Sequence, residues 1–213
     1  PVLDLDENTS NIISDRAFSN DKSKVTKFAS KYIDGMHEAG MKSTAKHFPG
    51  HGGVHEDSHI DLPVDDRSLE ELLQNDIEPY LKLKGKIDAV MCAHVLFSSI
   101  DKNIPSYSKF WIQKIIRNKL DFDCIVFSDD LSMYGAGEES YYTKTLKSLN
   151  AGCDMVLICN KRNHLKEVLD NLEKSSIKLS NKLSNMKKYK EVSWNDLNQD
   201  QRALNIRELL SKI

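Results

Sequence analysis

The sequence predicts a parallel α/β fold, in which short buried strands alternate with amphipathic helices. Three observations support this fold class. Short apolar runs recur along the chain, helical patterns separate them, and Gly, Asp or Lys residues bound most of the runs. Strand-then-helix repetition is typical of parallel βα units. Two architectures fit such a pattern, a doubly wound open sheet and a (β/α)₈ barrel.

The predicted strands are brief and continuously apolar rather than alternating, as expected for strands buried on both faces. They are Val2–Leu5, Thr44–Phe48, Ala89–Val95, Ile125–Ser128 and Met155–Cys159. Five strands are too few to close a barrel of eight, and the sequence begins inside an apolar strand. The chain is therefore expected to be either an open sheet or a barrel whose N-terminal part lies outside this sequence.

The predicted helices show apolar residues at three- and four-residue steps. Gly40 follows the first pattern as a C-terminal stop, and Ser68 opens the second with a capping box. The patterns cover residues 25–36, 69–81, 111–116, 146–149 and 165–172. From Ser175 onward the chain is rich in Lys and Asn but keeps recurring apolar residues. We expect peripheral helices there, at 175–213, and not a second domain.

Composition narrows the classes of partner. The 213 residues carry 30 Lys and Arg against 32 Asp and Glu, a net charge of −2. This balance gives no electrostatic reason to expect nucleic acid or an anionic membrane as partner. No apolar run approaches the roughly 20 residues of a membrane span, and the first residues do not resemble a secretory signal.

The cysteines point to a reducing compartment. All four lie in or beside apolar stretches, and no two of them form a C-x-x-C pair. Cysteine used as a small buried apolar residue favours a cytoplasmic location, without disulfides or structural zinc.

Ionisable side chains gather where two of the predicted strands end, which is where ligand sites of parallel α/β folds lie. The strand Thr44–Phe48 contains Lys46 and His47 and leads into a Gly- and His-rich segment. Histidines 47, 51, 55 and 59 are four apart, but the intervening Pro and Gly residues exclude a helix. A metal site formed by these histidines with Asp57, Asp129 and Asp130 remains an alternative.

Two further pairs suggest acid–base and nucleophilic chemistry. Asp57 and His59 are two residues apart, so in an extended loop the carboxylate can orient the imidazole and stabilise its charged form. Asp129 and Asp130 follow the strand Ile125–Ser128. We expect Asp130 to be the N-terminal cap of a helix in the following segment and Asp129 to point into the site.

The segments KHFPGHGGVHEDSH and VFSDDLSMYGAG, with DAVMCAHVLFSSID between them and AGCDMVLICN after them, resemble glycoside hydrolase family 3. The match is best to its NagZ-type branch, the cytoplasmic β-N-acetylglucosaminidases of bacterial cell-wall recycling. The resemblance runs from Pro1 to about Asn171. It implies a (β/α)₈ (TIM) barrel that here lacks about the first three strands, so that 1–213 forms one partial catalytic domain.

The resemblance also assigns roles to individual residues. It implies that Asp129 is the nucleophile, that His59 is the acid/base and that Asp57 is the dyad partner of His59. It further implies that Arg16, Lys46 and His47 bind the sugar. His51 and the neighbouring glycines are expected to set the path of the loop.

The implied reaction is retaining hydrolysis of terminal N-acetylglucosamine from peptidoglycan-derived muropeptides through a glycosyl-enzyme intermediate. It requires no metal or organic cofactor. The expected partner is a small carbohydrate, and the complete protein is expected to be a monomer. Two alternatives stay open, a metal-dependent hydrolase that uses the histidine-rich loop and an inactive fragment that needs its missing N-terminal part.

Overall fold

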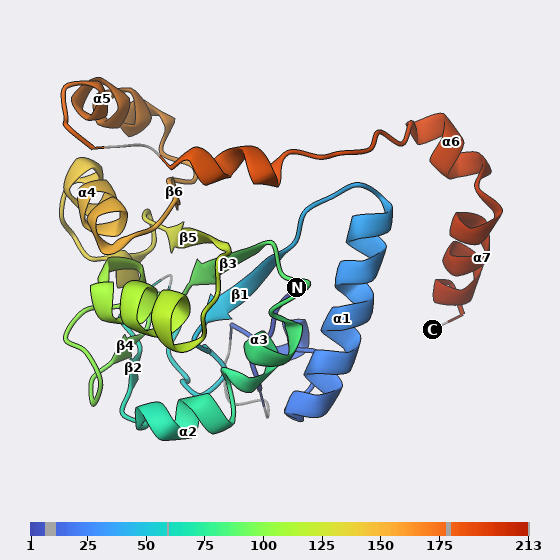
Figure 1. The fold of residues 1–213 in the computed structure, drawn as a ribbon, viewed down its shortest axis with the longest axis horizontal. Helices are drawn as coiled ribbons and strands as arrows, with labels where there is room; N and C mark the ends of the chain where they lie inside the picture. The colour runs from blue at the N-terminus through green and yellow to red at the C-terminus, as the bar shows by residue number, and fades with distance from the viewer. Residues whose placement is uncertain (7–11, 59, 178–179, 213) are drawn as a thin grey trace.

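The centre of the molecule is a four-stranded parallel sheet, seen in a computed structural model that describes residues 1–6, 12–58, 60–177 and 180–212. Its strands are β1 (Thr44–Phe48), β3 (Ala89–Cys92), β5 (Ile125–Asp130) and β6 (Met155–Leu157). They lie side by side in chain order (Figure 1). A doubly wound sheet reverses its strand order at a switch point, and this sheet does not reverse. The order is that of consecutive barrel strands.

The first predicted strand, Val2–Leu5, is wrong in extent. Only Val2 forms a bridge, parallel to Lys46 of β1. The N–H of Leu3 donates to the carbonyl of Lys46 at 2.7 Å. One residue later the carboxylate of Asp4 accepts the N–H of His47 at 3.2 Å, in place of a backbone carbonyl. A side chain therefore ends the ladder, which an apolar run cannot reveal.

The helices confirm most of the sequence pattern. They are α1 (Lys22–Glu38), α2 (Leu69–Gln74), α3 (Glu78–Leu83), α4 (Tyr141–Ala151) and α5 (Arg162–Glu173), together with a π-helix over Phe110–Lys119. The capping box at Ser68 is present, and Gly40 and Gly152 follow their helices at positive φ. The pattern over 69–81 is two helices, because the chain turns at Asn75 and Pro79 lies in the first turn of α3.

Strand limits are the second difference from the sequence. The predicted strand Ala89–Val95 ends at Cys92, after which β4 (Leu96–Phe97) pairs with β2 (Val64–Asp65) in a separate small sheet. The predicted strand Met155–Cys159 ends at Leu157. Cys92, Cys124 and Cys153 are buried as predicted, whereas Cys159 is exposed beyond the end of β6.

The core lies between the sheet and the helices that follow β1 and β3. Its largest buried side chains are aromatic and meet edge to face. Phe48 contacts Tyr80 with ring centroids 5.2 Å apart, and Phe97 contacts Trp111 at the same separation. Because Phe48 is the last residue of β1, this packing fixes the end of the strand from which the His-rich loop departs.

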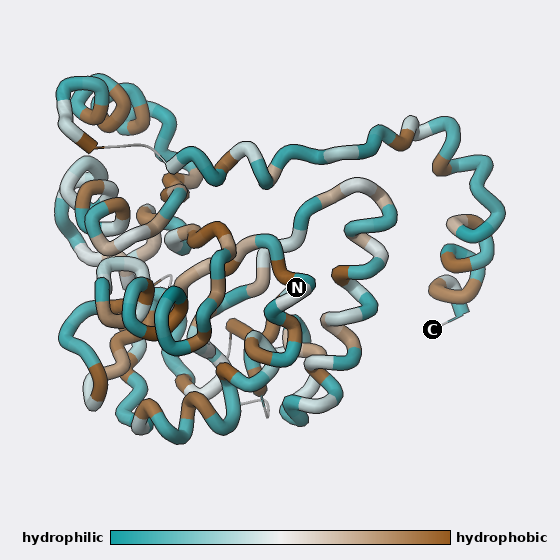
Figure 2. The backbone as a smooth tube through the Cα atoms, in the orientation of Figure 1, coloured by the Kyte–Doolittle hydropathy of each residue, from teal (hydrophilic) through white to brown (hydrophobic). Residues whose placement is uncertain are grey.

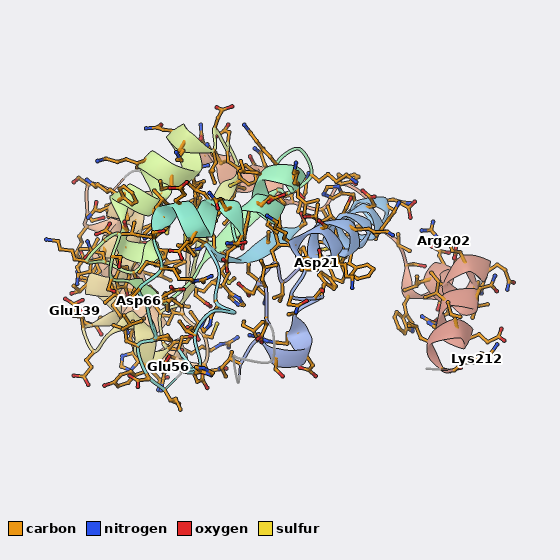
Figure 3. The ribbon with its side chains drawn as sticks, turned by 90° about the horizontal axis from the view of Figure 1, so that it is seen from below. Asp21, Glu56, Asp66, Glu139, Arg202 and Lys212 are labelled. Carbon is orange, nitrogen blue, oxygen red and sulfur yellow. The ribbon has the colours of Figure 1, made fainter. Side chains whose placement is uncertain are left out.

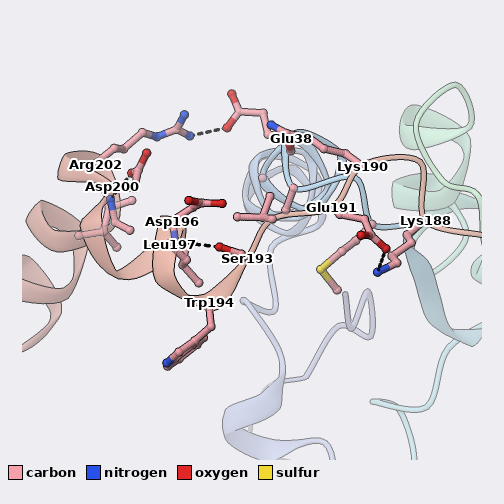
Figure 4. A pocket seen from close by; sticks show the side chains of 16 residues that line it. Glu38, Lys188, Lys190, Glu191, Ser193, Trp194, Asp196, Leu197, Asp200 and Arg202 are labelled. Carbon is pink, nitrogen blue, oxygen red and sulfur yellow. Dashed lines mark hydrogen bonds and ion pairs between the residues drawn. The ribbon is translucent and has the colours of Figure 1, made fainter.

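The C-terminal segment leaves the body and ends in α6 (Trp194–Gln199) and α7 (Gln201–Leu210). Figure 2 shows apolar residues on both helices. A groove of about 880 Å³ separates them from the end of α1, and an ion pair of 2.6 Å joins Arg202 to Glu38 across it (Figure 4). No helix among the described residues is long and apolar enough to cross a bilayer.

Candidate active site

The Gly-rich loop after β1 is packed tightly against the rest of the site. A Cβ atom on Gly52 would lie 1.8 Å from the carbonyl oxygen of Leu5, and one on Gly50 would lie 2.4 Å from Oδ1 of Asp76. Neither position has room for any side chain. The loop backbone therefore packs directly on the first segment of the chain at Gly52 and on Asp76 at Gly50, as expected for residues that set the path of the loop.

Asp4 connects the first segment to this loop. Its carboxylate is fully buried, with Oδ2 2.7 Å from Nδ1 of His47 and Oδ1 accepting the N–H of His51 at 2.8 Å. Burial raises the pKa of Asp4, but the charge and hydrogen bonds of His47 outweigh burial and bring the pKa below its ordinary value. Asp4 is therefore an ionised anchor that fixes the ring of His47, which is itself 6% exposed.

His51 continues the network toward the loop that carries Asp57. Its Nε2 lies 2.9 Å from the hydroxyl of Ser58, and both side chains are buried. Burial lowers the pKa of His51, and the negative charges of Asp4 and Asp129 only partly oppose this effect. His51 is accordingly neutral near neutral pH. Asp4, His47, His51 and Ser58 form one continuous hydrogen-bonded network, which we call the anchor network.

Asp129 is half-buried at the C-terminal end of β5. Its Oδ1 accepts the N–H of Asp130 at 2.8 Å, and among the described residues Oδ2 has no hydrogen-bond partner. A carboxylate held on one oxygen at a strand end can approach a ligand with the other. Asp129 therefore lies at the strand end where the sequence predicts a site, and its assignment as a nucleophile stays a prediction.

Asp130 behaves differently from its neighbour. Its Oδ1 accepts the backbone N–H groups of Ser132 and Cys159, both at 2.9 Å. Burial raises the pKa of Asp130, but these hydrogen bonds outweigh it and lower the pKa below its ordinary value. Asp130 thus caps the turn after β5 and ties it to the end of β6. The predicted helix cap is therefore wrong, because the segment that Asp130 caps is a turn and the next α-helix, α4, has its own N-cap at Ser140.

His94 is a site residue to which the sequence assigned no role. It lies two residues beyond β3, is 0% exposed, and neither ring nitrogen has a hydrogen-bond partner in the described part of the chain. Burial lowers its pKa to about 4, even though the charges of Asp129 and Asp130 oppose the shift. A neutral imidazole therefore lies close to the two aspartates.

Two predicted sugar-binding residues line one hollow of about 490 Å³. Lys46 projects from β1 and Arg16 comes from the short 3₁₀ helix Ser14–Arg16, and Met91 and Phe127 of the neighbouring strands complete the wall. Nε of Arg16 donates to the carbonyl of Ile12 at 2.8 Å. His47 faces Asp4 instead and is not part of this hollow.

The predicted acid/base lies outside the described residues, because His59 is not among them. Its partner Asp57 is half-buried, and its carbonyl accepts the N–H groups of Ile60 and Asp61 at 3.0 and 2.9 Å. These two hydrogen bonds tie Ile60 and Asp61 back to the backbone of Asp57. Figure 3 shows Glu56 of this loop on the same side of the body as Glu139, away from the tail residues Arg202 and Lys212.

The alternative of a metal site requires several histidine and carboxylate side chains to lie close enough together to bind one ion. Within residues 1–6, 12–58, 60–177 and 180–212, no three His, Cys, Asp or Glu side chains are arranged to hold an ion. Of the histidines considered, His47 uses Nδ1 on Asp4 and His51 uses Nε2 on Ser58. Each contact uses one nitrogen of the ring for a hydrogen bond within the anchor network.

Sequence reasoning missed several residues that shape the site. The clearest is Asp4, for which the available signal was a charged residue inside the apolar run PVLDL. Another is Arg67, which pairs with Asp65 at 2.7 Å and with Asp76 at 2.9 Å. A Cβ atom on Gly53 would lie 2.4 Å from the Arg67 guanidinium, so the loop backbone packs directly against this ion-pair cluster. No local pattern brings these three residues together.

The chain matches the model of the glycosyl hydrolase family 3 N terminal domain over residues 1–188. The chain belongs to glycosyl hydrolase family 3. Its curated relatives include a β-hexosaminidase of Haemophilus influenzae, 44% identical over 98% of this chain and 62% of that protein. Another is a β-hexosaminidase of Idiomarina loihiensis, 50% identical over 80% of this chain and 52% of that protein. The chain thus spans less than two thirds of the length of these family members.

Solved structures of the family agree on the fold. NagZ from Neisseria gonorrhoeae, in complex with N-trifluoroacetyl-D-glucosamine, matches all of this chain with a TM-score of 0.87 and 31% identity. The match covers 62% of that protein. The family resemblance inferred from the motifs is therefore confirmed, and the sheet is part of a TIM-like α/β fold.

Proposed function

We propose that this chain provides the catalytic residues of a retaining exo-β-N-acetylglucosaminidase that acts on peptidoglycan-derived muropeptides. One observation carries the proposal. Asp129 stands half-buried at the end of β5, its Oδ2 has no hydrogen-bond partner among the described residues, and neutral buried histidines lie close to it in a family 3 chain. The β-hexosaminidase relatives and the N-acylglucosamine bound to the gonococcal protein support the same substrate class.

The proposed reaction has two steps. A carboxylate oxygen of Asp129 attacks the anomeric carbon and forms a glycosyl ester, while the bond to the leaving oxygen breaks and His59 gives that oxygen its proton. His59 then removes a proton from water, the water oxygen attacks the anomeric carbon, and the carboxylate of Asp129 is released. Imidazole titrates near neutral pH, so one residue can act as acid and then as base.

The remaining site residues have supporting roles in this proposal. Asp57 orients the ring of His59 and stabilises its charged form. Arg16, Lys46 and His47 bind sugar hydroxyls, through hydrogen bonds that strengthen as charge develops in the transition state. Asp4 holds His47 in place for that task by the 2.7 Å contact. The chemistry uses side chains alone and calls for no cofactor.

We further propose that 1–213 is a single partial barrel domain, with 175–213 as its peripheral helical tail. The order of the strands and the ion pair between Arg202 and Glu38 support this division. We also propose that the complete protein is a cytoplasmic monomer. The three buried cysteines are compatible with a reducing compartment.

Substitution and trapping of Asp129 test the proposal. In the complete protein, Asp129→Ala is expected to lower kcat/KM for an aryl β-N-acetylglucosaminide by roughly 10³-fold or more, since no neighbouring group replaces a covalent nucleophile. A fluorinated N-acetylglucosaminyl donor should label the peptide that contains Asp129. Label on another carboxylate would refute the assignment, and Asp130→Asn serves as the neighbouring carboxylate control, expected to accept the label normally.

A further inference from the structure

In the loop that follows the His-rich turn, Ser58 is the one buried side chain among the described residues of 55–62. His55, Glu56 and Ile60 are exposed, Ile60 to 74%, whereas Ser58 between them is 1% exposed. Ser58 stands directly between Asp57 and His59 in the sequence. A small polar side chain that is buried within an exposed loop fixes that loop where it is buried.

The side chain of Ser58 connects the loop to the anchor network. Its hydroxyl lies 2.9 Å from Nε2 of His51, and the backbone N–H of His51 donates to Asp4 at 2.8 Å. Asp4 also holds His47. The position of the loop is thus set by the same carboxylate that sets a predicted sugar-binding ring.

The backbone of Ser58 connects the loop to the nucleophile side of the site. Its carbonyl accepts the N–H of Gly135 at 3.0 Å. Gly135 belongs to the segment that follows β5, five residues beyond Asp130. A Cβ atom on Gly135 would lie 3.1 Å from the carbonyl oxygens of both Ser58 and His94, so the two segments approach as closely as a glycine permits.

From these contacts we propose that Ser58 is a positioning residue, which latches the acid/base loop to His51 on one side and to Gly135 on the other. The proposal rests on the proposed glycosidase function and adds to it a physical link between the acid/base loop and the segment after Asp129. Loss of the latch lets the loop move relative to Asp129. Proton donation, which depends on that distance, then suffers more than nucleophilic attack.

Measuring kcat/KM for two substrates with different leaving groups tests the proposed effect of Ser58 on proton donation. In Ser58→Ala of the complete protein, kcat/KM should fall roughly 3- to 10-fold more for a disaccharide, whose leaving alkoxide needs a proton, than for a nitrophenyl glycoside. Gly135→Ala strains the same contact from the other side and should shift the ratio in the same direction. Ser106→Ala is the matched control. Ser106 is also buried, and its hydroxyl donates to the backbone carbonyl of Cys92 at 3.2 Å; among the described residues its side chain forms no hydrogen bond to either loop.

Hydrogen exchange tests the latch without relying on activity. Ser58→Ala should speed amide exchange in residues 54–58 and 133–137 and leave β5 unchanged, whereas Ser106→Ala should not affect the two loops. Equal loop exchange in Ser58→Ala and the unsubstituted protein would overturn the latch, and so would a uniform increase across all strands. A different outcome separates the two proposals. If Ser58→Ala speeds exchange in the two loops as expected, but the unsubstituted complete protein hydrolyses no β-N-acetylglucosaminide, the proposed function fails while the latch stands.

Discussion

Buried ionisable side chains around the site are stabilised by specific partners. Asp4 has His47 and two backbone N–H groups, and Arg67 lies between Asp65 and Asp76. Such pairing offsets the cost of removing charge from water, which is several kcal/mol for an isolated ion. Asp4, whose pKa is lowered, and Arg67, whose pKa is raised, therefore remain charged. His94 meets the same cost differently, by remaining neutral.

The lowered pKa of His94 predicts a loss of stability in acid. The pKa is about 4 in the folded protein, whereas an unfolded histidine titrates near 6.5. Between these pH values the unfolded chain binds more protons, so stability rises with pH and is lost as pH falls from about 6.5 toward 4. The contribution is about 3 kcal/mol.

The variant His94→Phe tests this prediction. Phenylalanine keeps the ring volume and cannot titrate, so urea unfolding between pH 4 and 7 should depend less on pH in the variant. At pH 7 its stability should be close to that of the unsubstituted protein, because neither ring nitrogen has a described partner to lose. An unchanged slope with pH would show that other groups dominate the acid sensitivity.

His59→Ala distinguishes an acid/base from a residue that only binds. For a disaccharide substrate the expected loss in kcat/KM is roughly 10²- to 10⁴-fold, and for a nitrophenyl glycoside it is much smaller, because nitrophenolate leaves with little protonation. Asp57→Asn should show a weaker form of the same selectivity. Equal losses for both leaving groups in the first chemical step would instead make His59 a positioning residue.

The positions of candidate site residues were predictable from sequence where they lie within a strand or at its end. Asp129 and Lys46 occupy such positions, and the structure places them at or in β5 and β1. Asp4, Ser58 and Arg67 were not predictable from local patterns. Each acts through a partner distant in sequence or through a single buried contact. The spacing of apolar residues along the sequence does not reveal that a serine in an exposed loop is buried.

At the scale of elements, the existence of strands and helices followed from hydrophobic periodicity, while their ends did not. The strand β1 has the predicted limits, since Phe48 packs into the core and Pro49 follows. The predicted first strand does not continue beyond Leu3, because the carboxylate of Asp4 accepts the N–H of His47 in place of a backbone carbonyl. The helix predicted over 69–81 divides before Pro79. Ends are decided by single side chains, and periodicity averages over several.

Two glycines give opposite predictions for the same substitution. Gly52→Ala would place a Cβ atom 1.8 Å from the carbonyl of Leu5, so the loop or the first segment must shift. The expected destabilisation is about 1–3 kcal/mol. Gly35 lies within α1 with nothing within 4 Å of an added Cβ, so Gly35→Ala should raise stability by about 0.5–1 kcal/mol.

Thermal unfolding of the two variants measures this contrast. The melting temperature of Gly52→Ala should fall and that of Gly35→Ala should rise relative to the unsubstituted protein. Activity should fall only in Gly52→Ala, since its loop carries the anchor network. A neutral result at Gly52 would mean that the loop tolerates displacement from Leu5 and does not depend on the close approach.

At the scale of the whole molecule, the sheet is a short arc of a barrel. In the described part of the chain β6 has one strand neighbour, β5, and beyond β1 there is only the bridge at Val2. Met91, Phe127 and Leu157 line an open hollow on the sheet. In a closed barrel, strands are paired on both edges and the interior is filled by side chains. Among the described residues, the outer edge of β6 is therefore unpaired, the outer edge of β1 is paired only at Val2, and the hollow is open.

These open edges predict the behaviour of the 213-residue chain produced alone. Unpaired strand edges and exposed apolar surface favour association, and Leu209, Leu210 and Trp194 of the tail are each more than 60% exposed. We expect the chain to be poorly soluble or oligomeric and at best weakly active. Light scattering coupled to size-exclusion chromatography measures the state directly. A monomeric chain with the full activity of its longer relatives would contradict this expectation, since the sheet would then be stable and competent with both edges open.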